Sequence, residues 1–117
     1  MISTFEFSDY VVGILVNSDI NDKVIDEIHA EILSKLEENE TINLFVEIEK
    51  GHHVSLKTML KDLIFKLDHA KQFNKIAMVT DLNWLATVMS MKDLIMTAEV
   101  RSFETEERLE AMNWISQ

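Results

Sequence analysis

Two polar side chains stand close to the ends of short apolar runs in the C-terminal half of the chain. Asp81 follows the run 76–79, and Arg101 lies near the end of the run 98–103. In parallel α/β sheets, ligands bind in the crevice outside the carboxyl ends of the strands. An arginine at such an edge can hold a carboxylate or a phosphate. Asp81 and Arg101 are therefore candidates for a polar ligand site, and the structural alternative is a helix cap and an ordinary ion pair.

Histidine and carboxylate side chains also gather where Glu47 and Glu49 precede His52 and His53. Zinc is bound by such groups, but adjacent histidines point apart and supply at most one ligand from this loop. The chain has no cysteine and no pair of histidines four residues apart. It also lacks a recognisable nucleophile–base pair and a glycine-rich phosphate loop. We therefore predict no metal, no cofactor, no catalytic residue and no enzymatic activity.

A methionine-rich apolar segment follows Asp81. Methionine adapts its shape, so such a segment suits a variable apolar ligand or a partner helix. Ordinary core packing and the interface of a homodimer are the alternatives. The candidate ligand- or partner-binding residues of this segment are Trp84, Val88, Met89, Met91, Ile95 and Met96.

Alternating short apolar runs and amphipathic stretches predict the elements that position these residues. Strands are expected at 5–7, 10–16, 42–48, 76–79 and 98–103, and helices at 21–38, 55–70, from 81 through at least 91, and 104–115. The order ββαβαβαβα predicts a single α/β domain over residues 1–117. Its sheet of four to five strands is expected to be mostly parallel and flanked by helices, with the first strand antiparallel at an edge.

Two local features refine this expectation. Gly13 interrupts an apolar run, which predicts a bulge or a close approach of another part of the backbone. The helix 55–70 is expected to bury one apolar stripe, formed by Leu56, Leu60, Leu63, Leu67 and Ala70.

The composition limits the classes of partner. The 21 acidic and 11 basic residues give a net charge of −10, which disfavours binding to nucleic acid and to anionic membranes. The longest uncharged run, 82–91, is half the length of a membrane-spanning helix. Glu6 and Asp9 stand near the N-terminus without a basic region, so no secretory signal is expected. We therefore predict a cytoplasmic protein without stable membrane insertion.

Motifs in the second half of the chain resemble the SpoIIAA-like family of small bacterial proteins of the STAS/SEC14 type. The resemblance is carried by Ile76-Ala-Met-Val-Thr-Asp81, Trp84, Glu99-Val-Arg101, Phe103, Glu106, Ala111 and Trp114-Ile115. It implies an α/β fold and a non-enzymatic regulatory or protein-interaction module. Its SEC14 side, together with the methionine-rich segment, favours the alternative of a carrier or sensor of a small apolar or lipid-like ligand.

STAS domains proper carry a serine that a kinase phosphorylates, in the loop after a central strand. Ser55 stands near that place, but the Asp-Ser pair and the following glycine of the family motif are absent around it. Ser55 is thus either a phosphorylation site or the N-cap of the next helix. A regulatory protein, an apolar small molecule and a second copy of the chain are the expected partners.

Overall fold

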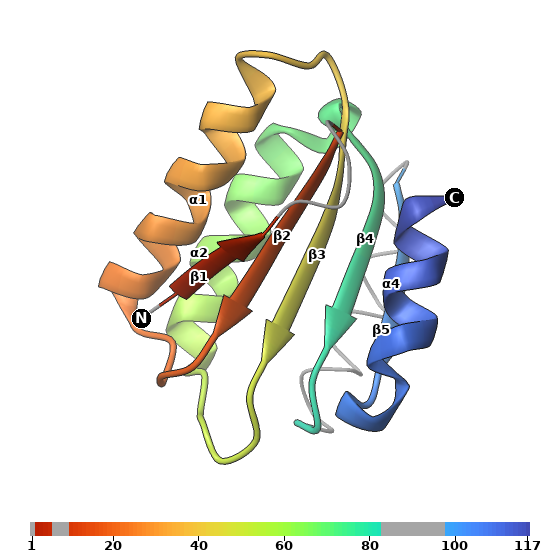
Figure 1. The fold of residues 1–117 in the computed structure, drawn as a ribbon. Coiled ribbons are helices and arrows are strands. Elements are labelled where there is room, and N and C mark those ends of the chain that lie inside the picture. Colours follow the sequence, from red (N-terminus) through yellow and green to blue (C-terminus); the bar gives the residue numbers. More distant parts are fainter. Residues whose placement is uncertain (1, 6–9, 83–97) are drawn as a thin grey trace.

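The computed structural model describes residues 2–5, 10–82 and 98–117. Five strands form one sheet in the spatial order β1-β2-β3-β4-β5 (Figure 1). Their bounds are β1 Ile2–Phe5, β2 Val11–Val16, β3 Ile42–Ile48, β4 Phe73–Val79 and β5 Glu99–Phe103. The helices are α1 Asp22–Leu36, α2 Leu56–Asp68 and α4 Arg108–Ser116, with two short 3₁₀ turns, η1 Ala70–Gln72 and η2 Thr105–Glu107.

The sheet is mixed. β1 pairs antiparallel with β2, and the three remaining pairs, β2–β3, β3–β4 and β4–β5, are parallel. The predicted α/β class and the antiparallel first strand at the sheet edge are confirmed. The third expected helix lies in 83–97, outside the described residues, so the full predicted order of elements is not tested.

The two faces of the sheet have separate cores because side chains of a strand alternate between faces. Helices α1 and α2 cover one face and α4 covers the other (Figure 1). The larger core contains Leu44, Val46, Ile76 and Met78 of the central strands. The smaller core beneath α4 contains Val11, Phe45, Ala77, Val79, Ala111, Trp114 and Ile115.

Helix α1 follows the sequence pattern closely. The Asn21 side chain accepts a hydrogen bond from the Val24 N–H at 3.0 Å, which caps the helix start. Ile25, Ile28 and Ile32 are buried, and their spacing of three to four residues places them on one face of the helix.

Helix α2 departs from its predicted stripe. Leu60 is 52% exposed, whereas Asp62 and Lys66 are buried together with Thr58 and Met59. Leu63 and Ala70 are half-buried. The structure does not describe the side chains of Leu56 and Leu67. The prediction for Leu60 was wrong because polar groups of α2 find partners inside the fold.

Those partners lie between α1 and α2. Lys66 Nζ lies 2.8 Å from Asp62 Oδ2, and the second carboxylate oxygen of Asp62 lies 3.0 Å from His29 Nε2. The His29 ring stacks on Phe65, with 3.8 Å between ring centroids. A buried charge becomes tolerable when it is paired and hydrogen-bonded, so this cluster lets α2 turn a polar side inwards.

Gly13 is a site of close approach, as predicted. It stands opposite Phe5 in the β1–β2 ladder. A Cβ atom at this position would lie 2.7 Å from the Phe5 carbonyl oxygen and 2.9 Å from its ring. Only glycine therefore lets Phe5 lie over β2, where its ring packs edge-on against Phe45.

Candidate functional site at the carboxyl edge of the sheet

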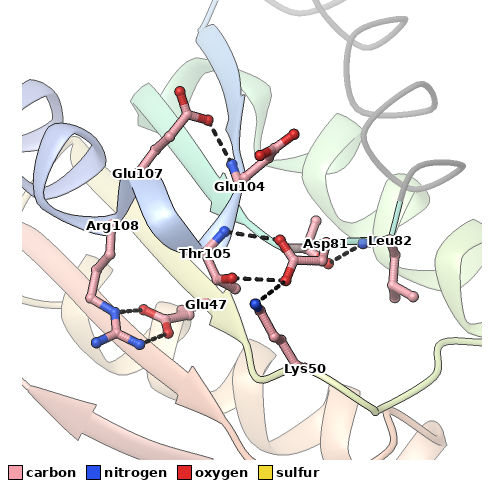
Figure 2. A network of polar contacts seen from close by, with 9 residues as sticks. Glu47, Lys50, Asp81, Leu82, Glu104, Thr105, Glu107 and Arg108 are labelled. Carbon is pink, nitrogen blue, oxygen red and sulfur yellow. Dashed lines mark hydrogen bonds and ion pairs between the residues drawn. The ribbon is translucent and has the colours of Figure 1, made fainter.

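The carboxyl ends of β3, β4 and β5 meet at one edge of the sheet, where polar side chains form a network (Figure 2). Arg108, the first residue of α4, donates from Nε to Glu47 Oε1 at 2.7 Å and from a terminal nitrogen to Glu47 Oε2. The Glu47 side chain is 3% exposed, whereas that of Arg108 is 54% exposed. This carboxylate raises the pKa of the Arg108 guanidinium. The ion pair joins the end of β3 to the start of α4.

Asp81 is the centre of a second group at this edge. Thr105 donates to it twice, from its backbone N–H to Oδ1 at 3.1 Å and from its hydroxyl to Oδ2 at 2.7 Å. Lys50, in the loop after β3, places its ammonium 3.7 Å from Asp81 Oδ2 (Figure 2). The Thr105 N–H is the main cause of the lowered pKa of Asp81. Asp81 thus connects three segments of the chain. It follows β4, and its carboxylate contacts both the β3–α2 loop and the turn η2.

Two open hollows flank this network. One, of about 270 Å³, is lined by Lys50, Gly51, His52, Thr80 and Asp81 among others. The other, of about 290 Å³, is lined by Glu47, Glu49, Lys50, Thr105, Glu106 and Arg108. Gly51 has a φ of +88°, which only glycine adopts easily, and it turns the loop away from β3. This crevice outside parallel strand ends is the usual location of ligand contacts in such sheets.

Arg101 and Asp81 are not brought together as a pair. Arg101 stands opposite Ala77 in the β4–β5 ladder, whereas Asp81 follows the end of β4. The Arg101 guanidinium lies 4.7 Å from the centroid of the Trp114 ring, on the α4 side of the sheet. Asp81 occupies the predicted polar edge, and Arg101 packs on α4 near the middle of β5.

Ser55 stands immediately before α2. Its hydroxyl oxygen accepts from the Thr58 N–H at 3.2 Å and donates to the Thr58 hydroxyl at 2.8 Å. This is the geometry of a helix N-cap. The capping alternative therefore describes the contacts of Ser55, and its phosphorylation stays a prediction.

The candidate apolar site is not described. Trp84, Val88, Met89, Met91, Ile95 and Met96 all fall within 83–97, outside the described residues. The predictions made for them remain open.

The loop that contains His52 and His53 is held by contacts to Asp19. Asp19 Oδ1 accepts from the His53 N–H at 2.8 Å and lies 3.4 Å from His52 Nδ1. The hydrogen bond from His53 is the main cause of the lowered pKa of Asp19. Among the described residues, no group of three or more histidines or acids could hold a metal ion.

Three residues of the edge were not singled out from the sequence: Lys50, Thr105 and Arg108. Each lies just after a strand or at the start of a helix. Its contacts therefore depend on how the parallel strands align with one another, which the sequence does not show. Glu47 carried a usable signal, because it is a charged residue within an apolar strand and therefore needs a partner.

Comparison with known proteins agrees with this architecture. A structural neighbour is an uncharacterised protein from the DUF3478 family with a SpoIIAA-like fold, from Shewanella loihica PV-4. The superposition has a TM-score of 0.70 and covers 98% of this chain and 92% of that chain. The 17% sequence identity means that the likeness shows the fold alone.

No curated protein matches the sequence significantly. Within the described part of the chain, no helix is long and apolar enough to cross a membrane. A family model described as SpoIIAA-like matches residues 11–116, which is most of the chain. The chain therefore belongs to the SpoIIAA-like family.

Proposed function

We propose that this chain is a non-enzymatic, STAS-like regulatory module that binds a protein partner through the carboxyl edge of its sheet. The observation that carries the proposal is the fixed position of Asp81 beside an open hollow. Two hydrogen bonds from Thr105 hold the carboxylate, and Lys50 approaches it from an exposed loop. A polar surface that is already ordered loses little conformational entropy on binding, which favours recognition of a partner.

The arrangement of charges also favours binding over catalysis. Asp81 accepts two hydrogen bonds from Thr105, and these interactions stabilise its charged carboxylate. A general acid or base at neutral pH needs a pKa shifted towards neutrality. The pKa of Asp81 is shifted in the opposite direction.

The test is affinity capture from an extract of the source cells, with the partner identified by mass spectrometry. Lys50→Glu introduces a negative charge beside Asp81 and should abolish recovery of the partner. Lys71→Glu is the matched control, because Lys71 is also an exposed lysine and lies in η1, which precedes the opposite end of β4. Equal recovery by both variants, or no partner above background, contradicts the proposal.

A second candidate function is the carriage or sensing of a small apolar or lipid-like ligand beside the segment 83–97. It is motivated by the methionine-rich segment, and the described residues contain an apolar cavity between α1, α2 and the sheet, lined by Ile25, Ile28, Val46, Met59 and Met78 among others. The cavity measures about 20 Å³, which is room for roughly one water molecule. A lipid-sized ligand therefore requires the helices to separate.

Native mass spectrometry of protein purified from cells tests this second function. A retained ligand should add a constant mass that delipidation removes. A clean mass of the chain alone, with no thermal shift on addition of fatty acids, contradicts it.

A further inference from the structure

Two helices on opposite faces of the sheet expose a leucine framed by charge. On α2, Leu60 is 52% exposed, and Lys57 and Lys61 stand three residues before and one residue after it. On α4, Leu109 is 78% exposed. Glu106, in the preceding turn η2, and Glu110, in α4, stand at the same two offsets from Leu109. The two helix surfaces therefore have the same pattern with opposite charge.

Residues three and four apart lie on one face of a helix. Ile64 extends the apolar surface of α2 by one turn and is 61% exposed. Lys61 also contacts Asp26 of α1 at 2.8 Å, and this carboxylate raises the Lys61 pKa, so Lys61 remains charged. The α2 surface is thus apolar and carries two lysines, one of them beside Asp26, within an acidic protein of net charge −10.

We propose that the α4 surface of one copy of this chain docks on the α2 surface of a second copy. Antiparallel packing of the two helices would place Leu109 against Leu60 and Ile64. In this arrangement Lys57 faces Glu110 and Lys61 faces Glu106. The contact would bury three exposed apolar side chains, pair Lys57 with Glu110, and bring Glu106 to Lys61, which also contacts Asp26.

A second copy fits better than an unrelated partner because the chain itself carries both complementary halves. The halves lie on opposite faces of the sheet, since α2 covers one face and α4 the other (Figure 1). A contact between different surfaces of identical subunits is head-to-tail, and it produces a ring or an open chain instead of a closed dimer.

One helix from each copy gives a small interface, and small interfaces are weak. Assembly should therefore depend on protein concentration. It should also weaken with salt, because charges at the rim of a contact are screened between about 0.05 M and about 0.5 M salt.

Sedimentation velocity on the whole chain tests the proposal. The average mass should rise with concentration at low salt and should fall towards that of one chain at high salt. Leu60→Glu and Leu109→Gln should each remain at the mass of one chain. Leu33→Gln, which changes an exposed leucine of α1, is the matched control and should assemble as the unaltered protein does. Circular dichroism checks that each variant is folded.

Mixing the two blocked variants gives the sharpest result. Leu60→Glu keeps an intact α4 surface and Leu109→Gln keeps an intact α2 surface, so an equimolar mixture should form pairs of two chains and nothing larger. Three outcomes would overturn the proposal. They are an unaltered protein that stays at the mass of one chain, variants that assemble as well as the control, and a mixture that does not pair.

Discussion

Two polar clusters in the described part of the chain differ in their access to water. The cluster between α1 and α2 joins His29, Asp62 and Lys66, and all three side chains are buried. The network at the carboxyl edge joins Asp81, Thr105 and Lys50 beside an open hollow. Both contain a carboxylate that is paired with a lysine. Only the second can exchange its lysine for water or for a partner.

The difference separates residues that maintain the fold from residues available for function. Breaking a buried ion pair leaves a charge without solvent, so its members are tightly constrained by stability. An exposed pair contributes little to stability because water competes with it and salt screens it. The loss of stability on substitution should therefore decrease from the cluster between α1 and α2 to the network at the carboxyl edge of the sheet. Three experiments test that order.

The largest effect is expected for Asp62→Ala. This change leaves the Lys66 ammonium, whose side chain is 2% exposed, without its carboxylate. Removing one partner of a buried pair costs about 3–5 kcal/mol. Urea unfolding followed by circular dichroism should show this loss of stability at pH 7.

The matched control replaces both members with apolar residues of similar size, Asp62→Leu together with Lys66→Met. Such replacements are often neutral or stabilising. The double variant should therefore be more stable to unfolding than Asp62→Ala. A less stable double variant would show that the cluster stabilises the fold through more than the pairing of its charges.

An intermediate effect is expected for the Glu47–Arg108 pair, which spans the two environments. Arg108→Ala leaves the buried Glu47 carboxylate without its partner and should lower the free energy of unfolding by about 2 kcal/mol. Glu47→Gln leaves a half-exposed guanidinium that water can solvate, and it should cost about 1 kcal/mol. The unfolding midpoints of the two variants measure these losses. A lower midpoint for Glu47→Gln than for Arg108→Ala would contradict the expectation that an unpaired Glu47 is the more costly of the two.

The smallest effect is expected for Asp81→Asn, less than about 1 kcal/mol at pH 7. The pKa of Asp81 lies below its ordinary value of 3.8 because Thr105 donates hydrogen bonds to the carboxylate. Its contribution to stability is therefore present above pH 3.8 and is lost as the pH falls through the folded-state pKa. The difference in unfolding midpoint between the two proteins should shrink from pH 7 towards pH 3, and a growing difference would contradict this assignment.

Much of the fold could be predicted from the sequence because it follows from local patterns. The apolar run of β3, the Asn21 cap of α1 and the glycine at position 13 each determine structure through their immediate neighbours. The inward side of α2 was not predictable in this way, because burial of Asp62 and Lys66 depends on His29 in another helix.

The site was predictable in part. Asp81 was found because a polar residue after an apolar run marks a strand end in an α/β fold. Its partner Thr105 could not be found, because their contact depends on the register of β4 against β5. Arg101 carried the same type of signal as Asp81, but it stands opposite Ala77, before the edge is reached.

The spatial order of the strands is also their order along the chain. During synthesis, each strand can therefore add to the strand made just before it, and the sheet can grow while the ribosome is still translating. The cover of the second core comes last. Until α4 has been made, Phe45, Ala77 and Val79 lack the helix that buries them. The nascent chain thus carries an uncovered apolar face, and completion of α4 ends that period of exposure to chaperones and to aggregation.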